Sequence, residues 1–340
     1  MPSLEVATAT VDAFHPEYIP VGVFVGGTSG VGEAMLKRLG QSLNGNIHLI
    51  IVGRNKAAAE RTFASLPKSS RGASVLREFV HCDATLMANI EVASDSIKQL
   101  VNDAAGGKIH FLVNSAGYAT FLPVDPTKDD LDDQMVMRYY GRWKFIDELL
   151  PLLQKARDAG EPARVMSVLA GGHLFKGTLN VDDMGLKKTW TWTRSFKNLL
   201  WSSAYNDMMI EVSLHLFLAG CCLLICAILQ EFSLRNPGIA FTHIHPGVVD
   251  TPALETVYGH WIWRLLWPLV MVAHYFLLVT PEQCSQWMLH ALLDRKEGFF
   301  SCGSNGDDVA HGKFMRQSTE VTRKALWDHT REVTRSRTSN

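Results

Sequence analysis

Three glycines that follow the first apolar run are spaced for holding a phosphate group. Gly26, Gly30 and Gly32 lie in the segment VGGTSGVGEAM, residues 25–35. A side chain at these positions would keep a pyrophosphate away from the backbone N–H groups and from the positive end of the following helix. The segment therefore predicts a dinucleotide-binding loop, with a tight turn that binds nothing as the alternative.

Alternating strands and helices must position this loop. Apolar, β-branched runs predict strands over residues 21–26, 46–53, 76–83, 109–117, 163–172 and 238–247. Helical patterns separate or follow these runs, notably over residues 30–43, 131–157 and 318–333. This alternation predicts an α/β fold in which a doubly wound parallel (Rossmann) sheet is covered by helices on both faces, with a C-terminal helical extension.

Five motifs, in order over about residues 20–255, resemble those of the short-chain dehydrogenase/reductase family. The loop resembles the family's TGxxxGxG, with Val25 in place of the threonine, and the IIVGRN, HCDAT, NSAG and HPGVVDT segments follow in the family's order. The resemblance implies cofactor contacts from Gly26, Thr28, Ser29, Gly30, Gly32, Arg54, Asn55, Asp83, Ala84, Asn114, Ala116, Gly117, Pro246, Gly247, Val249 and Thr251.

The end of the second expected strand bears on which cofactor binds. IIVGRN places Arg54 and Asn55 there and supplies no carboxylate for a ribose hydroxyl. A 2′-phosphate would meet a guanidinium instead, so NADP(H) is expected rather than NAD.

Two further segments are similar to a fungal subgroup of the family that is common in secondary metabolism. They are ARVMSVLAGG, residues 163–172, and RNPGIAFTHIHPG, residues 235–247. The likeness implies reduction of a ketone, or oxidation of an alcohol, on an apolar small molecule such as a polyketide or terpenoid.

The family's proton-transfer residues lack counterparts here. Hydride transfer to a carbonyl builds charge on oxygen, which requires a proton donor and a polarising hydrogen bond. The family's serine, tyrosine, lysine and asparagine positions fall on Ala170, Arg194, Asn198 and Arg138. The nearby Ser167 is expected to point in a different direction.

Three substitutes for the missing groups can be weighed. Tyr205 is the candidate catalytic acid, although Met209 stands where a lysine would be needed, and an ordinary half-buried tyrosine is the alternative. Tyr140 and Lys144 have the right spacing on the wrong helix, which is also typical of a simple helical pair. His173 could polarise a substrate or could be an ordinary loop histidine.

Composition excludes several classes of protein. A net charge of −1 over 340 residues offers no basic face, so a nucleic-acid partner is not expected. The six cysteines lack the spacing of zinc sites, so no metal is expected. Acidic residues stand where a signal peptide needs an apolar core, which indicates a cytoplasmic protein and leaves membrane association open.

An apolar run over residues 212–229 lengthens the helix expected before the last strand by about five turns. If residues 212–229 are removed, the flanking residues form one continuous amphipathic helical pattern. This favours the hypothesis that the run is translated from an intron that was not spliced out. A spliced transcript that still encodes the run would exclude this origin. A homodimer-interface helix and a membrane span are the two other interpretations.

The expected organisation is an N-terminal extension over residues 1–19, an NADP-binding domain over 20–300 and a C-terminal extension over 301–340. The expected function is NADP-dependent oxidoreduction of an apolar small molecule. Two alternatives stay open: a catalytically degenerate NADP-binding protein, favoured by the missing Ser-Tyr-Lys set, and a membrane-associated lipid or sterol reductase.

Overall fold

The computed structural model describes residues 1–117, 126–169, 184, 229–252, 278–309 and 320–335. Tyr205, His173 and residues 212–228 of the apolar run lie outside these ranges.

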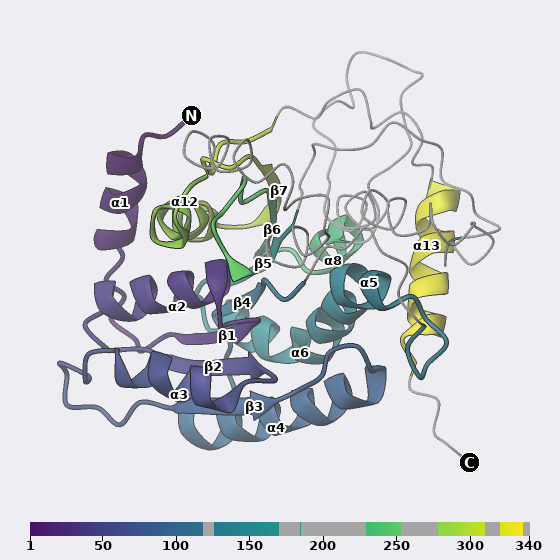
Figure 1. Cartoon of the computed structure of the whole chain (residues 1–340), viewed down its shortest axis with the longest axis horizontal. Helices are drawn as coiled ribbons and strands as arrows, with labels where there is room; N and C mark the ends of the chain where they lie inside the picture. Colours follow the sequence, from purple (N-terminus) through teal and green to yellow (C-terminus); the bar gives the residue numbers. More distant parts are fainter. Residues whose placement is uncertain (118–125, 170–183, 185–228, 253–277, 310–319, 336–340) are drawn as a thin grey trace, which may run out of the picture.

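Seven parallel strands form a single sheet in the order β3-β2-β1-β4-β5-β6-β7 (Figure 1). Their bounds are β1 Val21–Val25, β2 His48–Gly53, β3 Arg77–His81, β4 Phe111–Asn114, β5 Ala163–Val168, β6 Ile239–Ile244 and β7 Gly298–Cys302. The six strands predicted from the sequence are confirmed, and with them the doubly wound α/β fold. The seventh strand, β7, was not among the predictions.

Helices cover both faces of this sheet (Figure 1). Their bounds are α1 Leu4–Asp12, α2 Gly30–Ser42, α3 Lys56–Ala64, α4 Met87–Ala105, α5 Asp133–Met135, the π-helical turn η1 Val136–Tyr140, α6 Gly141–Asp158, α8 Leu229–Arg235, α12 Pro281–Asp294 and α13 Glu320–Val333. Helices α4 and α6 pack on one face, whereas α2, α3 and α12 pack on the other.

Strands β1 and β2 are mostly apolar because both of their faces are buried. All residues of β1, and the first five of β2, are buried. Phe24 points to the α2 side of the sheet while its neighbours Val23 and Val25 point to the α4 side. Such continuous apolar runs are typical of parallel strands covered by helices on both faces.

The helix predicted over residues 131–157 is interrupted by a turn of different pitch. Residues 133–158 form α5, η1 and α6 without a break in the chain direction, and η1 is a π-helical turn. A π turn shifts the helical register by one residue and is frequent at functional sites. It ends two residues before Arg142, so it changes which side chains of α6 face the sheet.

The N-terminal residues form a helix that packs on the main body of the fold. Helix α1 contacts α12 and α2. Thr10 is hydrogen-bonded to the Nδ1 atom of His290 at 2.9 Å, and Asp12 forms an ion pair with Arg38. These contacts attach residues predicted only as an extension to the α2 side of the sheet.

The C-terminal helix α13 packs against α6, on the right in Figure 1. The rings of Trp327 and Trp143 meet edge to face, with centroids 5.5 Å apart. The Oγ1 atom of Thr330 lies 2.7 Å from the hydroxyl of Tyr139. The predicted amphipathic helix therefore buries its apolar side in the core that α6 shares with the sheet.

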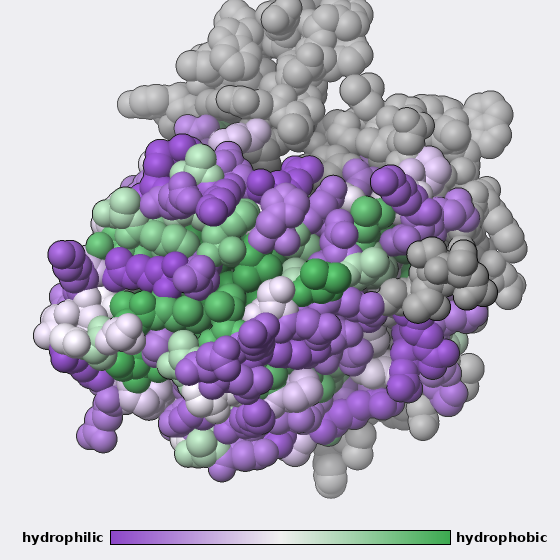
Figure 2. All heavy atoms as spheres, turned by 90° about the horizontal axis from the view of Figure 1, so that it is seen from below, coloured by the Kyte–Doolittle hydropathy of each residue, from purple (hydrophilic) through white to green (hydrophobic). Residues whose placement is uncertain are grey.

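The side of the molecule formed by α3, β3 and α4 shows hydrophobic residues between hydrophilic ones (Figure 2). Strand β3 is an edge of the sheet, and its Arg77 donates hydrogen bonds to main-chain carbonyls next to α3. Charged side chains on a short edge strand hinder pairing with another chain. Among the helices in the described ranges, none has both the length and the hydropathy that a membrane crossing requires.

Candidate functional site

A cleft of about 540 Å³ opens at the carboxyl ends of the central strands. It is lined by residues that follow β1, β2, β3, β4, β5 and β6. The chain runs from β1 outward to β3 on one side and then returns to place β4 on the other side of β1. Ligands of open α/β sheets bind at such a switch point, so the cleft occupies the expected position.

Most of the residues expected to contact a cofactor line this cleft. They are Gly26, Thr28, Ser29, Gly30, Gly32, Arg54, Asp83, Ala84, Ala116, Gly117, Pro246, Gly247, Val249 and Thr251. The structure thus brings together segments that are more than 200 residues apart in the chain.

Asn55 and Asn114 are not among the residues that line the cleft. The side-chain oxygen of Asn55 accepts a hydrogen bond from the Ala58 N–H at 3.0 Å and so caps the start of α3. Asn114 is the last residue of β4 and is only 1% exposed. Asn55 is therefore used for helix capping, and Asn114 lies in the interior behind the cleft.

The glycine loop is held close to the end of β4. A Cβ atom at Gly26 would lie 2.4 Å from the Ala116 backbone nitrogen, and one at Gly32 would lie 2.7 Å from the Gly26 carbonyl oxygen. Gly26 also has a φ angle of +95°. Glycine is therefore required at both positions because the neighbouring backbone leaves no room for a side chain. This reason adds to the one from the sequence, that a side chain would keep a phosphate group away from the loop.

The start of α2 leaves backbone donors available to the cleft. Ser29, the N-cap residue, makes no side-chain hydrogen bond to the first turn. Ser29, Gly30 and Gly32 all line the cleft. The first N–H groups of a helix, together with its dipole, favour an anion at this end.

Asp83 lies on the cleft wall in a conformation fixed by its own loop. Its Oδ1 atom accepts hydrogen bonds from the Thr85 N–H at 3.2 Å and the Thr85 hydroxyl at 2.9 Å. The carboxylate therefore holds the turn that follows β3 and keeps Ala84 at the cleft.

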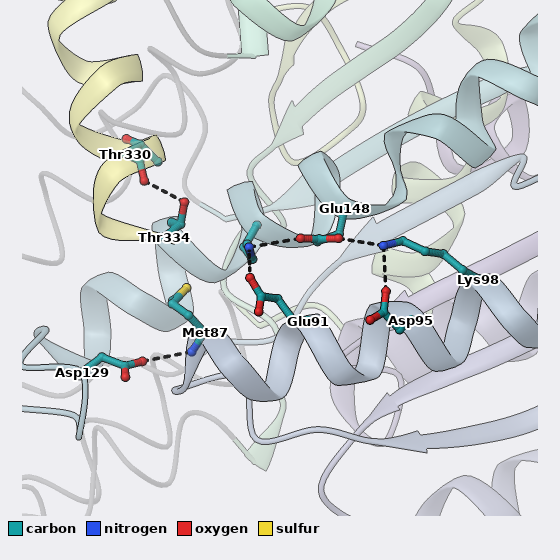
Figure 3. Close-up of polar contacts among 9 residues, drawn as sticks. Met87, Glu91, Asp95, Lys98, Asp129, Glu148, Thr330 and Thr334 are labelled. Carbon is teal, nitrogen blue, oxygen red and sulfur yellow. Dashed lines mark hydrogen bonds and ion pairs between the residues drawn. The ribbon is translucent and has the colours of Figure 1, made fainter. Parts of the chain in front are cut away.

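Tyr140 and Lys144 do not form a catalytic pair, and neither lines the cleft. The Tyr140 hydroxyl is 2.9 Å from the His329 Nε2 atom on α13. The Lys144 ammonium instead pairs with Glu91 and Glu148 between α4 and α6. Figure 3 shows these two glutamates, with Glu148 also paired to Lys98. Tyr140 and Lys144 thus bind different partners, on α13 and on α4 and α6. The other candidate acid, Tyr205, lies outside the described residues.

Arg142 on α6 is a cleft residue that sequence reasoning missed. Its Nη1 atom donates to the Ser167 hydroxyl at 2.6 Å and to the Val168 carbonyl at 2.9 Å, and its Nη2 atom donates to the Ala116 carbonyl at 2.8 Å. The side chain is 3% exposed, and burial lowers the pKa of its guanidinium to about 9.

Arg138, one turn earlier, lines the same cleft and is 6% exposed. Burial lowers its pKa to about 10, and its charge contributes to the lowered pKa of Arg142. Both groups remain cationic at neutral pH. Arg138, which stands at the position of the family's asparagine, is therefore one of two buried cationic side chains at the cleft.

Ser167 faces α6 and does not line the cleft. It is fully buried, and in the sheet it stands between Asn114 of β4 and His243 of β6. The expectation that Ser167 points differently from the family's serine stays a prediction, because it compares Ser167 with Ala170. The aligned positions Ala170, Arg194 and Asn198 lie outside the described residues.

Comparisons with known proteins agree with this arrangement. The family model described as short chain dehydrogenase matches residues 21–177. Oxidoreductase andH of Emericella variicolor is 31% identical over 293 residues, which cover 85% of this chain and 74% of that protein.

Solved structures share the fold at low sequence identity. An NADPH-bound carbonyl reductase from chicken fatty liver aligns with a TM-score of 0.56 at 17% identity, covering 87% of this chain and all of that one. A 3-ketoacyl-(acyl-carrier-protein) reductase of Brucella melitensis complexed with NADH aligns with a TM-score of 0.54 at 17% identity, over 88% of this chain and all of the other.

Proposed function

This chain belongs to the short-chain dehydrogenase/reductase family, and we propose that it is an NADP-dependent oxidoreductase that reduces a ketone or oxidises an alcohol on an apolar small molecule. The observation that carries the proposal is the glycine loop at the open start of α2, which forms one wall of a cleft at the switch point of the sheet. Residues 20–300 would form the cofactor-binding domain.

A dinucleotide fits the residues present in the cleft. The N–H groups at the start of α2 would bind its pyrophosphate, and Gly26 and Gly30 keep side chains out of that space. Thr251 lies against the loop, since a Cβ atom at Gly30 would be 3.2 Å from its Cγ2 atom. When bound, the nicotinamide ring would supply or accept the hydride.

Arg54 supports NADP as the preferred cofactor. It follows β2 directly and lines the cleft. A guanidinium at this point would pair with a 2′-phosphate, whereas NAD-dependent proteins place a carboxylate there to bind the ribose hydroxyls. The solved neighbours include one with NADPH and one with NADH, so the preference rests on Arg54.

An apolar substrate is what the resemblance of residues 163–172 and 235–247 to a fungal secondary-metabolism subgroup implies. Turnover can be tested by following NADPH absorbance with a panel of aromatic and alicyclic ketones, using protein translated from verified cDNA. We expect NADPH oxidation that depends on the ketone. Tyr205→Phe should abolish it if Tyr205 is the acid.

A second candidate is a cofactor-binding protein without catalysis. It is favoured by the use of Ser167 in a hydrogen bond to Arg142 and by the engagement of Tyr140 and Lys144 outside the cleft. Saturable NADPH binding without hydride transfer to any ketone of the panel would identify this case.

A further inference from the structure

Arg142 brings a positive charge into the cleft wall, and its hydrogen-bond partners among the described residues are all neutral. Its four hydrogen bonds go to the Ser167 hydroxyl and to the carbonyl oxygens of Val168, Ala116 and Met137, all of which are neutral. Within the described part of the chain, no carboxylate forms an ion pair with it. Burying a charge without a counter-charge costs several kcal/mol, so an anion reaching this point would be stabilised.

The surroundings add to the positive charge. Arg138 lies one turn away on the same wall of the cleft. Among the described residues that line the cleft, Asp83 provides the sole carboxylate, and its Oδ1 atom is bound to Thr85. Among the described residues, the end of the cleft beside α6 therefore carries two cationic side chains, separate from the glycine loop and Arg54.

Counted over the described ranges, one N–H donor of Arg142 has no hydrogen-bond acceptor and could bind a ligand. A guanidinium has five N–H groups, and four hydrogen bonds account for all but one, which belongs to Nη2. A Cβ atom at Gly117 would lie 3.4 Å from Nη2, so a larger residue there would crowd this nitrogen. Ala116 and Gly117 both line the cleft, which places Nη2 at its wall.

We propose that Arg142, supported by the charge of Arg138, forms a subsite for a delocalised oxyanion, and that the apolar substrate carries such a group as a carboxylate or an enolate. The remaining Nη2–H would donate to one oxygen of the anion. This inference rests on the proposed function, because it assigns the substrate class of the same cleft. A hydrogen bond between a guanidinium and an anionic oxygen is stronger than one to a neutral oxygen. The subsite should therefore bind an anionic substrate more tightly than a neutral substrate of the same shape.

Binding of 2-naphthoate and of its neutral isostere 2-naphthamide to the NADPH complex of the full chain tests this subsite. We expect the complex to bind naphthoate about 10- to 100-fold more tightly than naphthamide, as charge-assisted hydrogen bonding implies. Arg142→Gln should remove this preference, and Arg142→Lys should keep part of it because the charge remains.

A matched control is Arg164→Gln. Arg164 is a buried arginine of β5 that donates to the Arg295 carbonyl at 2.7 Å and does not line the cleft. This variant should keep the naphthoate preference of the wild type. It separates the loss of a cleft charge from the general effect of removing a buried guanidinium.

Equal affinities of naphthoate and naphthamide for the wild-type complex would overturn the subsite, even if Arg142→Gln failed to fold. A preference retained by folded Arg142→Gln would also overturn it. Failure of the wild-type chain to bind NADPH is a different result, since it would refute the proposed function instead.

Discussion

The Nη1 atom of Arg142 lies 2.6 Å from the Oγ atom of Ser167, which ties helix α6 to strand β5 at the edge of the cleft. The serine hydroxyl accepts a hydrogen bond from a buried cation and faces the helix. This hydrogen bond therefore joins two buried side chains and should contribute to stability.

Ser167→Ala should lower the free energy of unfolding by about 1.5–3 kcal/mol, because a buried charged donor loses its acceptor. Urea unfolding monitored by circular dichroism measures the change. Ser301→Ala is the matched control, since Ser301 is a buried serine of β7 whose Oγ atom has no hydrogen-bond partner. An equal loss in both variants would contradict the importance of the Arg142 contact.

Gly26→Ala should destabilise the protein by at least about 2 kcal/mol more than Gly72→Ala. Both glycines have positive φ angles, but a Cβ atom at Gly26 would meet the Ala116 backbone at 2.4 Å, whereas one at Gly72 would meet no atom within 4 Å. The control therefore carries the backbone strain without the clash. Similar unfolding midpoints for the two variants would show that the loop does not pack on β4 as described.

Trp327→Ala should lower the free energy of unfolding by about 3–5 kcal/mol. Trp327 is 8% exposed, stacks edge to face with Trp143 and Phe232, and lies 4.6 Å from the Arg235 guanidinium. Leu234→Ala, which removes a side chain that is 55% exposed, should change stability by less than about 0.5 kcal/mol. A small effect at Trp327 would mean that α13 does not belong to the core.

Stability should fall as the pH is lowered through about 6.5, because burial lowers the pKa of His110 from its ordinary value. The His110 Nδ1 atom accepts from the Val21 N–H at 2.9 Å, so its Nε2–H is donated to Glu161 and the native ring is neutral. The unfolded chain then binds a proton that the folded chain does not, and stability is lost below the unfolded pKa of about 6.5.

Urea unfolding at pH 7.5 and 5.5 measures this loss, which cannot exceed about 1.4 kcal/mol per pH unit for one histidine. His110→Gln should reduce the slope, and the exposed His81→Gln should leave it unchanged. A slope that is the same in wild type and His110→Gln would exclude His110 as its source.

Arg54→Glu should weaken NADPH binding by about 10- to 100-fold and leave NADH binding equal or tighter, because a carboxylate repels a 2′-phosphate and accepts from ribose hydroxyls. Fluorescence titration with each nucleotide measures both affinities. Arg61→Glu, an equal charge reversal at an exposed position of α3, is the control. Parallel changes in NADPH and NADH affinity would contradict a role for Arg54 in the choice of cofactor.

The sheet could be predicted because buried parallel strands consist mainly of apolar residues in unbroken runs. Val21–Val25 and the segment from residue 49 to 52 of β2 are clear examples. Strand β7 was missed because it is a short edge strand, Gly298–Cys302, whose first three residues are only partly buried. Its pattern does not differ from that of a loop.

The cofactor contacts could be predicted from the sequence only for residues whose type fits one role and no other. Asn55 has the residue type for a cofactor contact and also for a helix cap, and the cap is the role that the structure shows. Arg142 was missed because the π turn at Val136–Tyr140 shifts the face of α6 and because the partners of Arg142 come from three separate segments. The helical periodicity of the sequence indicates neither the π turn nor the segments that contact Arg142.

The most direct test of the account is a titration of NADPH into the full chain, made from verified cDNA, with nucleotide fluorescence as the signal. The account predicts saturable binding at one site per chain, with tighter binding of NADPH than of NADH. Absence of saturable binding by either nucleotide would contradict a dinucleotide cleft at the glycine loop.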